Sequence, residues 1–244
     1  MMAQQEKLDS ISNNLANVNT EGYKRVDVSF KDLVYETLKR DGYPTTGNNA
    51  EPLNGTGVKA SGWLRDDGQG SLQETGLNTD MAIDGEGYFR VTLADGSKAY
   101  TRSGSFTIDS SGTLVDKNGN RLDVEYSGEK VSLDKGNFGI DKAGTITLNE
   151  NGKLTKVGKI NLYNFVGQDS MASVGESLYV PKAGAQGYTV TDSNINQGYV
   201  EASNVDIARE MTDMIVTQRA FELGSRGLKT ADEMWGIANN LRSR

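Results

Sequence analysis

The residues of this chain that could do chemistry are its carboxylates, because several of them lie close together. Asp66 and Asp67 are adjacent, and Asp80, Asp84 and Glu86 follow within a short stretch. Two carboxyl groups can cleave a glycosidic bond, one as general acid and the other as base or nucleophile. The chain carries 33 acidic residues, however, so neighbouring carboxylates occur without any catalytic demand. The sequence predicts no catalytic residue, and a carboxylate-based glycan-active or glycan-binding β-domain remains a remote alternative.

Two glycine-containing stretches resemble ligand loops without completing either pattern. Gly85-Glu86-Gly87 has the first two glycines of a dinucleotide fingerprint, but Arg90 stands where the third should be. The stretch also opens a predicted strand rather than a helix, which the fingerprint requires. Residues 116–120 resemble a calcium loop, but the glycine comes early and no glutamate closes the loop. Both stretches are therefore predicted to be turns.

The composition removes further classes of site. The chain has no cysteine and no histidine, which excludes disulfides, thiolate nucleophiles, imidazole bases and nearly every zinc site. Its net charge of −7 argues against binding nucleic acid. No apolar run approaches a membrane span, and no leader resembles a cleaved signal peptide. We expect no cofactor, no metal, no nucleic-acid partner and no small-molecule substrate.

The elements that would position any site begin with an N-terminal helix. Leu8, Ile11, Leu15 and Val18 recur at spacings of three and four, which places one apolar stripe along a helix, as in a coiled coil. Four asparagines crowd the end of this stretch, and their amides compete for nearby backbone groups. Gly22 can take the positive φ that ends a helix. The alternative is an ordinary amphipathic helix packed on its own domain.

A matching helix is predicted at the C-terminus. Ser203 can cap it, and Asp206 completes an S-x-x-D box. Three glycines in the stretch each weaken the helix by about 0.8–1 kcal/mol relative to alanine, so it needs a partner. We expect the two helices to bury each other's stripes and those of neighbouring copies. Positions alternating by four and three form the first stripe: Ile207, Met211, Met214, Gln218, Phe221, Ser225, Leu228, Asp232, Trp235 and Asn239.

The region between the helices has the pattern of short strands joined by turns. Residues 87–93 alternate apolar and polar side chains, turn at Asp95-Gly96 and return through residues 97–102. No helical pattern separates the strands, which excludes a parallel α/β fold and indicates an antiparallel meander, sandwich or barrel. Further strands are predicted at residues 105–109, 113–115, 140–148, 153–156 and 159–165, with turns at 110–112, 117–120 and 151–152.

The predicted fold class is therefore mainly β with α-helical termini, an antiparallel β-domain inserted between N- and C-terminal coiled-coil-like helices. Residues 1–22 with 203–244 would form a terminal, polymerising helical domain. Residues 23–57 would form an extended arm, passing into a short helix, and a linker. The β-rich outer domain would cover residues 58–202. Residues 41–57 hold two of the three prolines and are predicted to be a loop.

Four motifs, in order along the chain, resemble those of bacterial flagellar rod and hook proteins. Residues 12–24 resemble the N-terminal signature of that family. Residues 80–89 resemble its D-x-A-I-x-G-x-G-[FY]-F motif and residues 100–106 its Y-T-R-x-G-x-F motif. Residues 197–206, with 218–222, resemble the C-terminal signature. The family pattern extends further upstream than Met1, so the first helix is expected to be shortened, which should weaken polymerisation.

The resemblance implies a structural protein and not an enzyme. Such a subunit would self-assemble helically through its terminal helices into a tubular shaft of the basal body, transmitting torque from motor to hook. Length and motif wording favour the distal rod, with a hook or proximal rod subunit as the alternative. The implied partners are further copies of the chain, other rod proteins, the hook, and the flagellar export apparatus. That apparatus would deliver the chain outside the cytoplasmic membrane without a cleaved leader.

We expect a defined set of residues at the subunit interfaces. They are the stripe residues of both helices and the polar residues beside the first: Leu8, Ile11, Asn14, Leu15, Asn17, Val18, Gly22, Ile207, Met211, Met214, Gln218, Phe221, Leu228 and Trp235.

Overall fold

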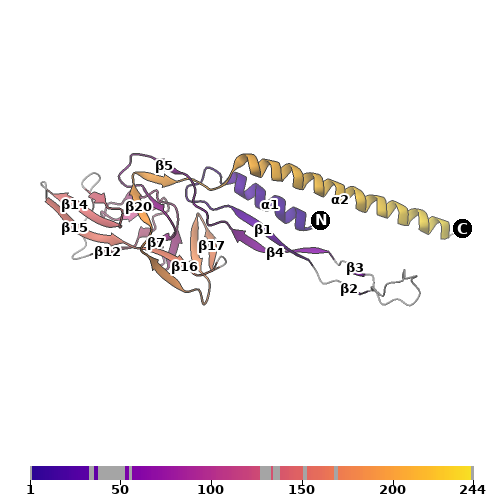
Figure 1. Cartoon of the computed structure of the whole chain (residues 1–244), viewed down its shortest axis with the longest axis horizontal. Coiled ribbons are helices and arrows are strands. Elements are labelled where there is room, and N and C mark those ends of the chain that lie inside the picture. The colour runs from indigo at the N-terminus through magenta and orange to yellow at the C-terminus, as the bar shows by residue number, and fades with distance from the viewer. Residues whose placement is uncertain are drawn as a thin grey trace. The chain divides into compact units, whose positions relative to one another are not determined.

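The computed structural model describes residues 2–32, 36–37, 53–54, 57–126, 133, 138–150, 153–167 and 170–242. The chain divides into two compact units (Figure 1). The helical unit comprises Met1–Leu15, Val26–Leu64 and Ile207–Arg244, and the β unit comprises Ala16–Arg25 and Arg65–Asp206. Most of the predicted loop at residues 41–57, and all of the predicted turn at 151–152, lie outside the described residues.

The helical unit contains two helices in contact and two short antiparallel ladders. Helix α1 (Met2–Ala16) lies beside the first part of α2 (Ile207–Arg242). Strand β1 (Val26–Asp32) pairs with β4 (Val58–Arg65), and β2 (Glu36–Thr37) pairs with β3 (Leu53–Asn54). The predicted order of helix, antiparallel sheets and helix is confirmed. The short helix expected at the end of the arm is absent from the described residues there, because Val26, Val28 and Phe30 alternate with polar residues in β1.

The C-terminal boundary of α1 and the N-terminal boundary of α2 differ from those predicted from the sequence. Helix α1 ends at Ala16, so Val18 lies beyond it and not on the helical stripe. Helix α2 begins at Ile207, and Asp206 rather than Ser203 directly precedes it. The reason lies at Asn204, whose side-chain amide donates to the carbonyls of Asp66 and Gly68 at 2.9 Å each. These bonds hold residues 203–206 in a non-helical conformation.

The largest sheet of the β unit has nine strands, and all its pairings are antiparallel. Its main path runs β17 (Met171–Gly175), β18 (Leu178–Pro181), β8 (Lys98–Thr101), β7 (Tyr88–Thr92), β11 (Arg121–Leu122), β10 (Leu114–Val115) and β9 (Thr107–Ile108). Strand β16 (Leu162–Phe165) pairs with both β7 and β19 (Gly187–Val190). The predicted hairpin turns at Gly96, Gly112 and Gly119 are confirmed, each with a positive φ.

The other ladders of the β unit are smaller and also antiparallel. The four-stranded sheet runs β12 (Val124–Tyr126), β15 (Lys153–Ile160), β14 (Thr145–Glu150) and β13 (Phe138–Ile140). Two-stranded ladders join β20 (Asn194–Gln197) to β6 (Met81–Asp84) and β21 (Tyr199–Glu201) to β5 (Leu72–Glu74). The single strand predicted at 140–148 is wrong, because Gly144, with φ +79°, and Asp141 form a turn that divides it into β13 and β14.

The core of the β unit comes from the alternating side chains of these strands. Ile83, Phe89, Val91 and Phe106 are fully buried, and the rings of Phe89 and Phe106 meet edge to face with centroids 5.6 Å apart. In the part of the chain that the structure describes, both helices lack an apolar stretch sufficient to cross a bilayer.

Candidate functional site

Helix α1 binds β1 through polar side chains. Ser10 donates to the carbonyl of Val26 at 2.6 Å, and the Asn14 amide donates to the same carbonyl at 2.9 Å. The Asn14 side-chain oxygen accepts from the Val26 N–H at 2.9 Å, so this amide satisfies both backbone groups of one residue. Lys7 pairs with Asp27 one turn earlier. The buried face of α1 is thus Ser10, Ile11 and Asn14.

The same asparagine reaches α2. Its amide nitrogen lies 3.3 Å from Oε2 of Glu210, a residue with no exposed surface. Glu210 stands in the first turn of α2, where a carboxylate complements the positive end of the helix dipole. Asn14 therefore connects α1, β1 and α2 within the helical unit.

Some of the expected interface residues of the N-terminal segment are buried within the chain, and the others are half-buried. Ile11 and Asn14 are buried within the chain, and Leu8 and Leu15 are half-buried. Val18 and Asn17 are half-buried beyond the end of α1. These positions stay predictions for contacts between subunits.

The first stripe of α2 is partly covered within the chain. Met214 and Phe221 are half-buried, on the same side of the helix as the buried Glu210 and Thr217. The remaining expected interface residues of α2 are exposed. They are Ile207, Met211, Leu228 and Trp235, at 45–74%, together with Gln218.

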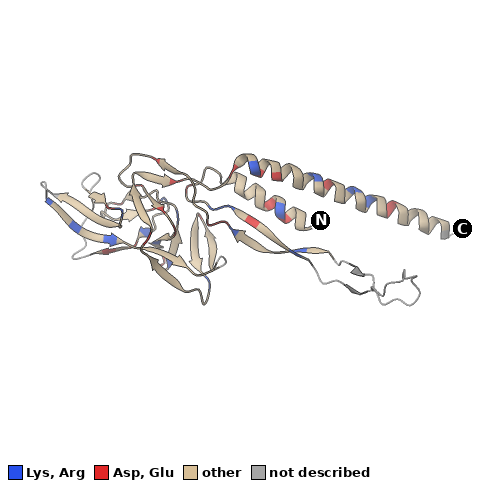
Figure 2. Cartoon of the chain, in the orientation of Figure 1, with Lys and Arg blue, Asp and Glu red and all other residues tan. Residues whose placement is uncertain are grey.

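Helix α2 carries a second apolar stripe that was not predicted from the sequence, because the prediction followed only one register of the helix. Its large members, Val216, Leu223, Met234, Ile237 and Leu241, are 61–74% exposed. The signal was the same four–three alternation, in a register shifted along the helix. Figure 2 shows charged residues at intervals along α2 with uncharged stretches between them. The complete second stripe is Val216, Ala220, Leu223, Gly227, Thr230, Met234, Ile237 and Leu241.

In the β unit, the family motifs meet at a buried group of charges, which we call the triad: Lys24, Arg102 and Glu201. Lys24 Nζ lies 2.7 Å from Glu201 Oε1, and Arg102 Nε lies 2.5 Å from Glu201 Oε2. Lys24 and Glu201 are each 1% exposed and Arg102 is 3% exposed. Burial lowers the pKa of Lys24 below its ordinary value of 10.5, and the neighbouring Glu201 carboxylate opposes that fall. The triad could not be predicted from the sequence, because its members are far apart along the chain.

Arg102 also explains the glycines that resembled a dinucleotide loop. Its guanidinium donates to the carbonyl of Gly85 at 2.5 Å and to that of Gly87. The two glycines have φ values of +115° and +120°, which L side chains rarely adopt. The predicted turn is therefore confirmed, and it presents its carbonyls to a buried arginine.

Two further motif glycines allow segments to touch. The Gly22 N–H donates to the carbonyl of Glu201 at 2.8 Å, and a Cβ on Gly22 would lie 2.4 Å from the nitrogen of Ser103. A Cβ on Gly104 would lie 1.5 Å from the carbonyl oxygen of Met81. Gly22, expected at a subunit interface, thus has a contact within the β unit, between the N-terminal signature and the motif at 100–106.

The carboxylates singled out for catalysis make ordinary structural bonds. Asp80 accepts from the Thr75 hydroxyl at 2.6 Å, and Asp67 accepts from the Tyr88 hydroxyl and from Arg65 Nε, each at 2.9 Å. Across the described ranges, no cluster of ligating side chains could share a metal ion. These bonds hold neighbouring segments of the β unit together.

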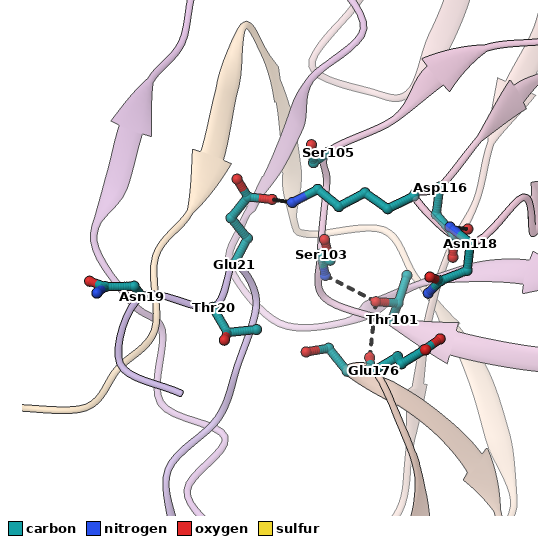
Figure 3. Close-up of a pocket in the computed structure, with 11 residues that line it drawn as sticks. Asn19, Thr20, Glu21, Thr101, Ser103, Ser105, Asp116, Asn118 and Glu176 are labelled. Carbon is teal, nitrogen blue, oxygen red and sulfur yellow. Dashed lines mark hydrogen bonds and ion pairs between the residues drawn. The ribbon is translucent and has the colours of Figure 1, made fainter. Parts of the chain in front are cut away.

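A polar cavity of about 370 Å³ opens beside these motifs (Figure 3). Glu21 lines one side and pairs with Lys117 at 2.9 Å, while Thr101 donates to the Ser177 carbonyl at 3.0 Å. Asp116, from the stretch that resembled a calcium loop, accepts from the N–H groups of Asn118 and Asn120. The predicted turn there is confirmed, and its carboxylate is already engaged.

Comparison with known proteins matches three parts of the chain to flagellar families. Residues 1–24 match the family described as flagella basal body rod protein. Residues 82–156 match the flagellar hook protein FlgE/F/G D1 domain, and residues 196–241 match the flagellar basal body rod FlgEFG protein C-terminal family.

Curated relatives match over nearly the whole length. The flagellar basal-body rod protein FlgG of Borreliella burgdorferi is 39% identical, over 99% of this chain and 95% of that protein. The proteins of that name from Agrobacterium fabrum and Bacillus subtilis are 37% and 35% identical, over 98% of this chain and 95% and 94% of theirs. On these similarities the chain belongs to the FlgEFG family of flagellar basal-body rod proteins, and it is a structural subunit of the rod rather than an enzyme.

Proposed function

We propose that this rod subunit self-assembles helically through its terminal helices into a tubular shaft that transmits torque from the motor to the hook. The observation that carries the proposal is the apolar surface of α2. Its first stripe is covered by α1 only in part, and its second stripe is exposed at every large residue. Burying each such side chain contributes about 1.5–3 kcal/mol to the free energy of association. A helix of a neighbouring subunit that covered these side chains would therefore bind strongly.

The proposal extends to position and partners. The FlgG relatives support the distal rod, with further copies of this chain as neighbours and other rod proteins and the hook at the two ends. Delivery would be by the flagellar export apparatus, to the outside of the cytoplasmic membrane. The terminal segments, residues 1–22 and 203–244, would carry polymerisation, with the exposed and half-buried members of the expected interface set at the contacts.

The test places a carboxylate on the second stripe. Leu223→Asp should raise the critical concentration for polymerisation by about tenfold or more, because a charge replaces a side chain that is buried on assembly. Ala238→Asp is the matched control, since it adds the same single negative charge at an exposed position outside both stripes. Sedimentation and electron microscopy of polymers would measure the difference, with circular dichroism to show that both subunits fold.

The N-terminal stripe is tested in the same assay. Leu15→Asp should also block polymerisation while the β unit stays folded. Wild-type polymerisation by both Leu223→Asp and Leu15→Asp would contradict assembly through the terminal helices.

A further inference from the structure

Three residues from three distant motifs form the triad, and their chemistry makes the two chain ends depend on each other. We propose that the triad is a closure lock: the β unit can bury its N-terminal segment only when its C-terminal segment is also in place. The two segments that lead to the terminal helices, residues 22–25 and 201–204, then become bound to the β unit together, and neither is bound without the other. This inference goes beyond the assembly role and does not rest on it.

The charges of the triad are unequal in number. The triad places two cations, Lys24 and Arg102, around one carboxylate in a nearly water-free position. Their other hydrogen-bond acceptors are neutral backbone carbonyls, Gly68 for the lysine and residues 83, 85 and 87 for the arginine. Among the described residues, Glu201 is the only carboxylate that bonds either cation, and the Asp67 carboxylate supports the charge of Lys24 more weakly, through its electrostatic field. Burying an unpaired charge is strongly unfavourable, so neither cation is stable inside without Glu201.

The chain around Glu201 also bonds to both neighbouring segments. The same residue accepts from the Gly22 N–H through its carbonyl and from the Gly70 N–H, at 2.8 Å, through its side chain. Three residues on, Asn204 accepts from the Arg25 N–H at 2.7 Å and donates to the 66–68 loop. The segment 201–204 thus connects residues 22–25 to residues 66–70.

The two cations of the triad precede its carboxylate along the chain. Glu201 follows Lys24 by 177 residues and Arg102 by 99. A chain that emerges from its N-terminus therefore presents both cations long before their carboxylate. Until the C-terminal segment arrives, the β unit has two cations that oppose closure, and the chain stays open.

The test uses the full chain and two readouts of the N-terminal segment. Glu201→Gln keeps the shape of the side chain and removes its charge, which leaves two cations unpaired. We expect tryptic cleavage after Lys24 and amide exchange at Gly22 to rise at least about tenfold. The Gly22 amide is informative because its acceptor, the backbone carbonyl of residue 201, is unchanged by the substitution. The Ala202 amide, which donates to the Ser71 carbonyl at 2.9 Å, should loosen in parallel.

Three further variants separate charge from shape. Glu201→Asp keeps the charge and shortens the side chain, so it should release the segment less than Glu201→Gln does. Lys24→Met leaves a neutral Arg102–Glu201 pair and should also be milder. Glu21→Gln is the control, since it removes only the exposed pair with Lys117 in the same segment, and exchange at Gly22 should not change.

Several results would overturn the lock. Unchanged protection of Gly22 in Glu201→Gln would do so, and so would release of Gly22 while Ala202 stays protected. If Glu201→Gln does not fold, the comparison passes to the other two variants of the triad. Failure of Glu201→Asp or Lys24→Met to fold as well would show that packing, and not charge balance, closes the unit.

Discussion

At the scale of single residues, the family motifs of this protein act by letting segments come close. Gly85 and Gly87 turn their carbonyls toward Arg102, and Gly104 brings its backbone against Met81. The sequence could show that these glycines belong to motifs, and it could predict turns at the first two. It could not show that Gly104 is needed for a contact, because the residue that it touches lies in another motif.

Gly104→Ala should be among the most destabilising single substitutions in the β unit. The new Cβ would overlap the Met81 carbonyl oxygen, at 1.5 Å, and that oxygen belongs to the backbone of a fully buried residue. We expect a loss of about 3 kcal/mol or more in the free energy of unfolding, measured in urea. Gly139→Ala is the matched control, since its Cβ would meet only the Thr147 hydroxyl, at 3.5 Å, and it should change stability little. Equal effects of the two substitutions would contradict the close approach.

At the scale of elements, α2 differs most from what its sequence suggested. The four–three alternation correctly predicted a long helix, and it placed Phe221 and Met214 on a face that α1 covers in part. It missed the second stripe, because that stripe repeats with the same four–three spacing in a shifted register and only one register was followed. The start of the helix was also mispredicted, since Ser203 and Asp206 make an acceptable cap by spacing alone. The side-chain bonds of Asn204 decided the outcome, and they depend on residues 66–68.

Gly227→Ala should stabilise α2 in the unassembled subunit. The glycine is in the helix interior, and a Cβ there would meet nothing within 4 Å, so the substitution removes backbone entropy without a clash. We expect a gain of about 0.8–1 kcal/mol in local helix stability, seen as slower amide exchange in residues 224–231. Gly96→Ala also enters open space, but its φ of +83° makes it the opposite control, and it should destabilise its hairpin. Faster exchange in Gly227→Ala would contradict the helix.

At the scale of the whole molecule, two tendencies oppose each other. The chain has a net charge of −7, which makes copies repel, while α2 carries large exposed apolar side chains that favour association. The composition excluded cysteine and histidine chemistry. It could not predict how much apolar surface stays uncovered, because that depends on which side of α2 is buried within the helical unit.

Salt should therefore promote assembly. Raising NaCl from 0.1 M to 1 M shortens the Debye length from about 10 Å to about 3 Å, which screens the repulsion and leaves apolar contacts intact. We expect the critical concentration for polymerisation to fall, as followed by light scattering. Leu223→Asp measured under the same conditions would show how much of the change depends on the second stripe. Polymers that dissolve as salt rises would mean that ion pairs between subunits dominate.

The hydrogen bonds that hold α1 against β1 have a mechanical consequence. Ser10 and Asn14, one helical turn apart, share the Val26 carbonyl, so sliding the helix along the strand by a single residue would strip both bonds at once. Apolar contacts can shift gradually under load, because one apolar neighbour can replace another. Two directional hydrogen bonds to the same carbonyl must instead break together. The contact between α1 and β1 is therefore suited to resisting shear along the helix axis, and under excess load it would break abruptly rather than slide gradually.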